Sequence, residues 1–258
     1  MPKKLEKSIA NVLGYDIAKH GKQLRPESHL RFLLPLLGID LVIDVGANNG
    51  QYGEMLRDLG FEGWILSFEP LPDAFAELER RLARDDRWLG LPLALGDAEA
   101  TAELNVSRNS VFSSLHAPNA RGRDQFSPRI DVVDTIEVAV RRLDDVLPAL
   151  LERMRPGAGG TTASGRPDLS PYRCLLKMDT QGHDAAVLDG GRETAAQSLA
   201  LHSELSVAGI YEDLPDYLEM LGRYRALGFE LTGIYPAERD RHTGHVVELD
   251  CIMARAGA

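Results

Sequence analysis

The chain has only two cysteines in 258 residues, Cys174 and Cys251, and neither belongs to a metal-binding spacing. Each lies in an apolar run typical of a strand, which favours buried, reduced thiols over a disulfide framework. No apolar stretch approaches the ~18 residues that a membrane-spanning helix needs. The N-terminus lacks the continuous apolar core and small-residue cleavage site of a signal peptide. These absences predict a cytoplasmic protein without a metal or a membrane span.

An excess of basic residues is also lacking. The sequence has 29 Lys and Arg against 39 Asp and Glu, a formal net charge of −10. Affinity for a nucleic-acid backbone needs clustered Lys and Arg, so we expect no nucleic-acid partner. Arg108, Arg121 and Arg123 could hold a small anionic acceptor, although solvated charge is the ordinary interpretation. The 44% hydrophobic and 26% charged composition is typical of a soluble globular protein.

Predicted strands and helices alternate over the first half of the chain. Residues 41–45 form a short apolar run rich in β-branched side chains, followed by a helical pattern over 51–59. The alternation repeats with a strand at 64–68, a helix at 72–84 and a strand at 91–95. Such alternation implies right-handed crossovers and a parallel sheet.

The sequence as a whole predicts one domain, preceded by an N-terminal extension and interrupted by one irregular loop. Residues 1–38 are expected to form an N-terminal helical extension, and residues 39–258 a single domain. Residues 156–171, rich in glycine, proline, serine and threonine, are predicted as a flexible loop, either a lid or disordered. The remaining predicted strands are 101–106, 136–142, 174–179, 198–205, 229–234 and 246–254, the last two as a hairpin, with helices near 185–188 and 215–227.

A glycine-containing loop follows the first predicted strand, with Asp44, Gly46, Asn48 and Gly50 at alternate positions and Gln51 opening the helix. In open α/β sheets, ligands bind outside the carboxyl ends of the strands. Glycine lets the backbone approach a ligand, and the helix N-terminus presents free N–H groups. The spacing matches neither the dinucleotide fingerprint Gly-x-Gly-x-x-Gly nor the phosphate-binding loop. A cofactor loop is predicted, with a tight turn that binds nothing as the alternative.

Acidic residues follow the next two predicted strands. Glu69 could accept hydrogen bonds from both ribose hydroxyls, and hydrogen bonds to charged groups contribute roughly 1.5–3 kcal/mol each. The alternative is a carboxylate at a helix start, and NAD enzymes use an acid in the same way. Asp97 could accept from an adenine amino group, or belong to an ordinary turn. With Asp44, these acids at consecutive strand ends predict a site shaped for a nucleoside.

Several segments resemble class I methyltransferases, and specifically the FkbM family. They are residues 42–52 (VIDVGANNGQY), 67–70 (SFEP), 94–97 (ALGD), 142–145 (RLDD), 176–182 (LKMDTQG), 187–191 (VLDGG) and 227–229 (LGF). The resemblance extends from about residue 39 to 255. Residues 179–182 read Asp-Thr-Gln-Gly where the family often has Asp-x-Glu-Gly, and His183-Asp184 replaces Tyr-Glu. These departures lie on the side where the resemblance places the acceptor, so they affect the acceptor more than the cofactor.

The resemblance implies a Rossmann-like α/β fold, with a seven-stranded, mostly parallel sheet, an antiparallel last strand and helices on both faces. It also implies S-adenosylmethionine as cofactor and O-methylation of a sugar, glycolipid or polyketide-type acceptor. Ser113 belongs to a serine-rich stretch that resembles one in the family and would line a pocket, although a plain polar loop is an equal alternative. The predicted cofactor-binding residues are Asp44, Gly46, Asn48, Gly50, Gln51, Glu69, Asp97 and Ser113.

An alcohol is a poor nucleophile at neutral pH, so a general base would typically contribute about 10²–10⁴-fold to the rate. The catalytic candidates are Asp179, His183 and Glu204, with Tyr211 and Asp250 behind them. Each has a structural alternative, such as capping a turn. A non-catalytic cofactor-binding protein, methylation of a carboxylate and an NAD-linked oxidoreductase stay open as functions. The acceptor and the oligomeric state, including a homo-oligomer, also stay open.

Overall fold

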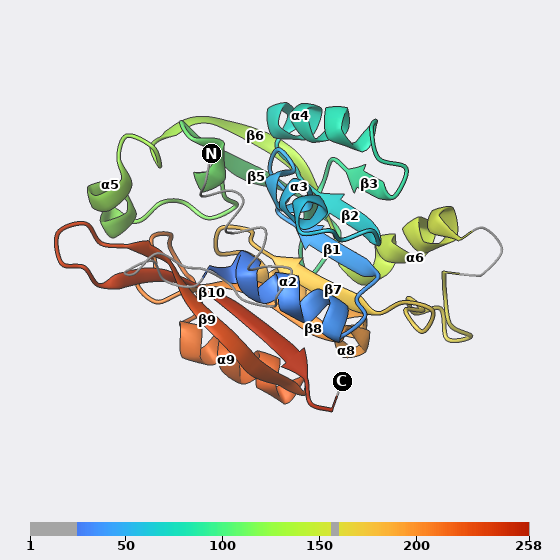
Figure 1. The fold of residues 1–258 in the computed structure, drawn as a ribbon. Coiled ribbons are helices and arrows are strands. Elements are labelled where there is room, and N and C mark those ends of the chain that lie inside the picture. Colours follow the sequence, from blue (N-terminus) through green and yellow to red (C-terminus); the bar gives the residue numbers. More distant parts are fainter. Residues whose placement is uncertain (1–24, 156–159, 258) are drawn as a thin grey trace, which may run out of the picture.

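A computed structural model describes residues 25–155 and 160–257. Its centre is a seven-stranded sheet in the order β3-β2-β1-β7-β8-β10-β9 (Figure 1). The strands are β1 (Leu41–Val45), β2 (Trp64–Phe68), β3 (Trp88–Leu91), β7 (Cys174–Met178), β8 (Ala200–Ser206), β9 (Phe229–Arg239) and β10 (Val246–Arg255). Neighbours from β3 to β8 pair in parallel, and β10 pairs antiparallel with both β8 and β9. The last strand alone therefore runs against the others, and the predicted fold class is confirmed.

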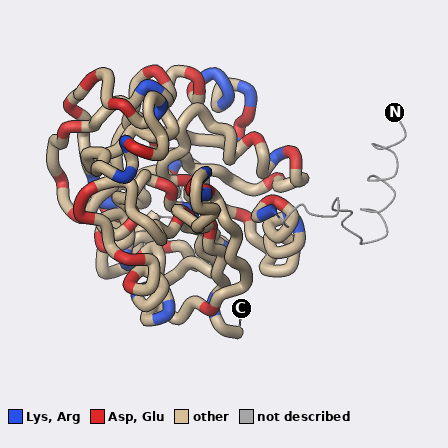
Figure 2. The backbone as a smooth tube through the Cα atoms, turned by 90° about the vertical axis from the view of Figure 1, so that its left-hand side faces the viewer, with Lys and Arg blue, Asp and Glu red and all other residues tan. Residues whose placement is uncertain are grey.

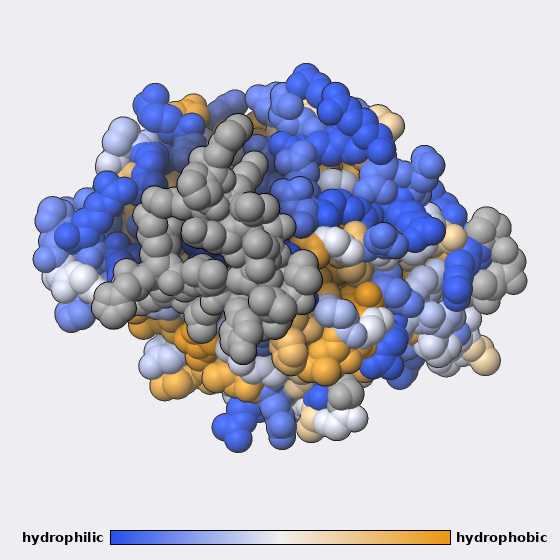
Figure 3. Space-filling view, viewed as in Figure 1, coloured by the Kyte–Doolittle hydropathy of each residue, from blue (hydrophilic) through white to orange (hydrophobic). Residues whose placement is uncertain are grey.

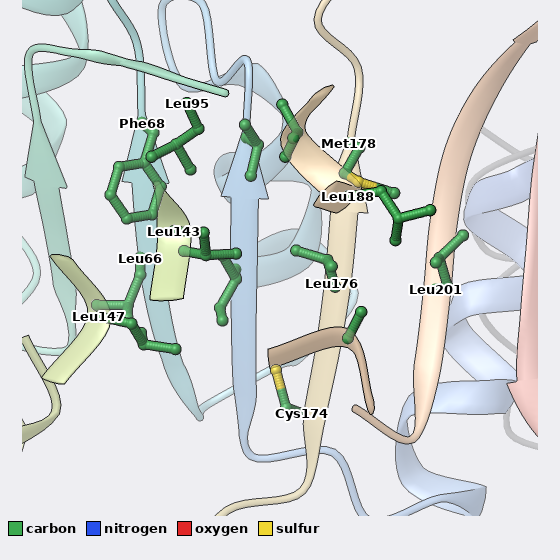
Figure 4. Packing of buried hydrophobic residues seen from close by; sticks show 14 of the residues in the cluster. Leu66, Phe68, Leu95, Leu143, Leu147, Cys174, Leu176, Met178, Leu188 and Leu201 are labelled. Carbon is green, nitrogen blue, oxygen red and sulfur yellow. The ribbon is translucent and has the colours of Figure 1, made fainter. Parts of the chain in front are cut away.

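Helices cover both faces of this sheet because its central strands are apolar on both sides. In β1, Leu41, Ile43 and Val45 pack on one face, whereas Val42 packs on the other. Figure 4 shows Leu66 of β2 beside Leu147 of α6, and Leu201 of β8 beside Leu188 of α7, on the first face. The helices on that face are α6 (Leu143–Met154), α7 (Asp184–Gly190), α8 (Arg192–Gln197) and α9 (Tyr217–Ala226). The opposite face carries α2 (Pro26–Leu36), α3 (Gln51–Asp58) and α4 (Pro72–Leu82).

A second, three-stranded sheet lies between β3 and α6 in the sequence, in the order β4-β6-β5. It comprises β4 (Ala94–Leu95), β5 (Ala100–Ser107) and β6 (Val132–Arg141). The prediction of one strand over residues 91–95 was wrong: β3 ends at Leu91, and β4 belongs to the second sheet. Pro92 separates them, and proline cannot donate to a ladder of hydrogen bonds. The segment between β5 and β6 carries the short 3-10 helix η1 (Ser110–Phe112) and α5 (Ala120–Phe126).

The surface is mixed in character. Acidic positions are spread over the backbone in the view of Figure 2. Apolar residues gather over α2 and the β9–β10 hairpin (Figure 3), where Phe32, Leu36 and Leu231 are exposed. Of the helices described, each is too short or too polar to cross a bilayer.

Two predicted regions are only partly described. Residues 1–24 and 156–159 lie outside the described residues, so most of the predicted N-terminal extension and the start of the 156–171 loop stay predictions. In the described part of that loop, Thr161 forms a bridge with Pro167, and Leu169 is buried in the core. The end of the loop at Pro167 and Leu169 is therefore packed against the domain, whereas residues 163–166 are exposed.

Candidate functional site

A cavity of about 430 Å³ opens at the carboxyl ends of β1, β2, β7 and β8. The structure brings together eight predicted site residues in its wall: Gly46, Asn48, Gln51, Glu69, Ser113, Asp179, His183 and Glu204. Three others do not line it. Asp44 is buried beneath the cavity, Gly50 turns the chain into α3, and Asp97 is exposed. The contact predicted between Asp97 and an adenine ring therefore gains no support from the cavity wall.

Glu69 follows β2 and is only 6% exposed. Its Oε2 accepts a hydrogen bond from the Asn48 N–H (2.7 Å), and its Oε1 accepts one from the Leu71 N–H (2.8 Å). Burial raises the pKa of Glu69 to about 7, although these hydrogen bonds and Lys177 oppose the rise. A carboxylate oxygen can accept more than one hydrogen bond. Glu69 is therefore held in place by the backbone and keeps acceptor capacity toward the cavity.

Asn48 connects the loop after β1 with the segment after β5. Its backbone has a positive φ of 47°, a conformation that asparagine tolerates better than most residues. Its Nδ2 donates to Ser110 Oγ (3.3 Å), and its Oδ1 accepts from the Asn49 N–H (2.8 Å). Nearby, Ser113 Oγ accepts from the Ser107 N–H (3.1 Å). These contacts hold η1 against the cavity, where Ser113 was predicted to lie.

Lys177, on β7, is a central cation that the sequence analysis missed. Its Nζ lies 2.9 Å from Asp44 Oδ1 and 3.6 Å from Asp179 Oδ2, and it donates to the Gly46 carbonyl (3.0 Å). Burial lowers the pKa of Lys177, but Asp44 and Asp179 outweigh burial and raise it above the ordinary lysine value. Asp44 therefore holds Lys177 in place beneath the loop and does not face the cavity. The sequence did offer a signal for this ion pair: Lys177 is the one charged residue in the apolar strand Cys174–Met178, and a buried charge needs a partner.

The glycines of the loop are required by packing within the protein. Gly46 has φ +75°, and a Cβ there would lie 1.9 Å from the Asp179 carbonyl oxygen. Gly50 has φ +88°, and a Cβ there would lie 2.9 Å from Leu78 Cδ1. The glycine spacing thus reflects the close approach of β1 to β7 and of α3 to α4. The spacing by itself does not show that a ligand contacts the loop.

Gln181 joins two of the predicted catalytic residues. Its Nε2 donates to Asp179 Oδ1 (3.2 Å) and to Glu204 Oε2 (2.9 Å). The Tyr211 hydroxyl donates to Gln181 Oε1 (2.9 Å), which fixes the orientation of the amide. Burial, followed by the charges of Glu248 and Asp179, raises the pKa of Glu204 well above the ordinary glutamate value. A carboxylate with a raised pKa is a stronger base in its ionised form, so Glu204 is a suitable proton acceptor.

His183 is paired with a second histidine. Its Nδ1 lies 3.2 Å from His116 Nε2, and the two rings are 5.4 Å apart. Burial, with a smaller contribution from His116, lowers the pKa of His183 to about 4. The ring is therefore neutral at pH 7 and weakly basic, which favours Glu204 over His183 as the base. His116 was not identified from the sequence, because the contact joins segments 67 residues apart.

Comparisons with known proteins match most of this chain to one protein family. A family described as "Methyltransferase FkbM domain" matches residues 44–231. The curated protein "Methyltransferase sdnD" of Sordaria araneosa is 28% identical over 58% of this chain and 59% of its own length. The "2-O-methyltransferase NoeI" of Sinorhizobium fredii is 24% identical over 67% of this chain and 65% of its own length. The chain thus spans about three fifths to two thirds of the length of these relatives.

Similarity to solved structures is weaker. An rRNA methylase from Streptococcus thermophilus aligns over 91% of this chain and 99% of its own, with a TM-score of 0.43 and 8% identity. A likeness at this level carries no information on the acceptor.

Proposed function

Because this chain belongs to the FkbM methyltransferase family, we propose that it transfers a methyl group from S-adenosylmethionine to a hydroxyl of a small acceptor. We propose a sugar, glycolipid or polyketide-type natural product as the acceptor. One observation carries the proposal: Glu69, at the end of β2, and Glu204, on β8, line the same cavity. One relative is named a 2-O-methyltransferase, which supports oxygen as the acceptor atom.

The residues present suit S-adenosylmethionine, which supplies a methyl group on a sulfonium when it is bound. The cavity of about 430 Å³ lies within the range of small-molecule sites, roughly 300–1,000 Å³. Glu69 would accept the ribose hydroxyls, because its oxygens are fixed by two backbone N–H groups. Phe68, Leu95 and Leu104 give the same end of the cavity an apolar wall that suits a purine ring.

On the acceptor side, Glu204 would take the proton of the attacking hydroxyl. Gln181 fixes the Glu204 carboxylate, and Tyr211 fixes Gln181. Asp179 stays beside Lys177, so its negative charge is partly neutralised. We therefore assign Glu204 as the general base and Asp179 as a group that orients the acceptor.

Calorimetry with S-adenosylhomocysteine, the demethylated product, tests the cofactor. We expect stoichiometric binding and a rise in melting temperature, since a ligand that binds only the folded state stabilises it. Glu69→Gln should weaken that binding, whereas Glu230→Gln, an exposed change on β9, should not. Absence of binding by the unmodified chain would refute the proposal. Binding combined with an unaffected biological output in Glu204→Gln would instead indicate a non-catalytic protein.

A further inference from the structure

The acceptor side of the cavity is strongly acidic. Asp179, Glu204, Glu238 and Glu248 line it together with Glu27 of α2. Among the described residues of the wall, Lys177 is the only lysine or arginine, and it is already paired with Asp44. Arg108, Arg121 and Arg123, considered above for an anionic acceptor, are not in this wall.

These carboxylates lie apart from the proposed ribose contact. Glu69 follows β2, whereas Glu204 and Glu248 are on β8 and β10, three and four strands further along the sheet. Neighbouring strands are about 4.8 Å apart, so the two ends of the site are separated by roughly 14–19 Å. The acidic end of the cavity is therefore free to bind the acceptor while the other end binds the ribose of the cofactor.

Glu248 is the unusual member of this group. The residue is 8% exposed, and among the described residues no hydrogen bond or ion pair joins its carboxylate to another side chain or backbone group. Ser206, opposite it in the β8–β10 pairing, also has a buried Oγ without a hydrogen-bond partner in the described part of the chain. A buried carboxylate without a partner is costly. Two polar groups at adjacent positions thus lack partners within the protein, and Glu248 faces the cavity.

We propose that Glu248, beside the proposed base Glu204, forms a subsite for a protonated amino group of the acceptor, so that the substrate is a hydroxylated amine. This assignment rests on the proposed methyl transfer. An ammonium group has three donors and no acceptor, and it would provide the hydrogen bonds and the positive charge that this wall lacks. Acidic acceptors would be repelled by the same carboxylates.

The subsite should respond to pH in a defined direction. Burial, with the charges of Asp179 and Glu238, raises the pKa of Glu248 to about 8. Protonated Glu248 attracts a cation less, so affinity for the amine should increase as pH rises through about 8. The titratable groups that face Glu248 are Glu204 on β8, Asp179 after β7, Glu238 on β9, Asp250 on β10 and Tyr211 after β8.

A matched pair of small probes tests the charge alone. 2-Aminoethanol and 1-propanol have the same size and share a hydroxyl, and an alkyl ammonium stays protonated below about pH 9. Ligand-observed NMR titrations would use the full chain, with and without saturating S-adenosylhomocysteine, between about pH 6.5 and 8.5. At pH 8.5, where Glu248 is mostly ionised, we expect 2-aminoethanol to bind about tenfold or more tightly than 1-propanol, because hydrogen bonds between charged groups are the strong ones. The preference should shrink toward pH 6.5 as Glu248 becomes protonated.

Glu248→Gln keeps the size of the side chain and should remove this preference, whereas Glu230→Gln should keep it. Equal affinity for the two probes at pH 8.5 in the unmodified chain would overturn the assignment, whether or not the variant folds. So would a preference that survives in folded Glu248→Gln. A loss of affinity for S-adenosylhomocysteine in Glu248→Gln would show that the subsite serves the ammonium of the cofactor instead. Failure of S-adenosylhomocysteine to bind the unmodified chain would refute the proposed function, and the probe pair would still test the subsite.

Discussion

Binding of the cofactor should depend on pH through Glu69. The carboxylate accepts two backbone N–H groups inside the cavity wall, and burial raises its pKa to about 7. Ribose hydroxyls donate better to the ionised form than to the neutral acid. The ratio of ionised to neutral Glu69 is about ten to one at pH 8 and one to ten at pH 6. The affinity for S-adenosylhomocysteine should therefore fall about tenfold between these values, equivalent to about 1.4 kcal/mol.

Isothermal titration calorimetry at several pH values measures this slope directly. In Glu69→Gln we expect a slope near zero, with binding at pH 8 weakened by about 1.5–3 kcal/mol through loss of charge-assisted hydrogen bonds. Burial raises the pKa of Glu248 to about 8, so Glu248→Gln is the necessary control and should retain the slope. A flat profile in the unmodified chain, or an unchanged slope in Glu69→Gln, would refute the assignment of Glu69 to the ribose.

Three other predictions concern the support of the site. Gly46→Ala would place a Cβ 1.9 Å from a carbonyl oxygen, whereas Gly60→Ala, at a similar φ of +90°, meets nothing within 4 Å. Chemical denaturation should show a loss of about 2–4 kcal/mol for the first and about 1 kcal/mol for the second, and equal losses would contradict the packing argument. Lys177→Met leaves Asp44 buried without its counter-charge, so the unfolding free energy should fall by about 3–5 kcal/mol, and by less if Asp44→Asn is added. Gln181→Glu places a third carboxylate between Asp179 and Glu204, which should move the pH optimum of methyl transfer upward; an unmoved optimum would remove Glu204 from the role of base.

The strands of the main sheet could be predicted from the sequence because local hydrophobic patterns determine them. Strands such as Leu41–Val45 are apolar on every side, and their alternation with helices leaves few topologies. The pattern predicted the final hairpin of β9 and β10, whereas the place of an antiparallel last strand in a seven-stranded sheet was implied by the family resemblance. The acids after strands were predicted for the same local reason, and Glu69, Asp179 and Glu204 do meet in one cavity wall.

Contacts between distant segments could not be predicted in this way. The pairing of His116 with His183 joins loops that no periodicity relates, and Gln181 reaches Tyr211 through a left-handed backbone conformation. The second sheet was missed because residues 91–95 look like one apolar run. Pro92 was the overlooked signal, because proline is confined to the edges and ends of strands.

The loop after β1 is built on a strand that the chain reaches about 130 residues later. Gly46 packs against the Asp179 backbone, and Lys177 donates to the Gly46 carbonyl. Segments far apart in sequence must close a long loop before such contacts form, which slows folding. During synthesis, therefore, the loop cannot acquire its final shape until β7 has been made and has paired with β1. A fragment that ends before Cys174 would carry the whole glycine motif and still lack the surface on which that motif takes its conformation.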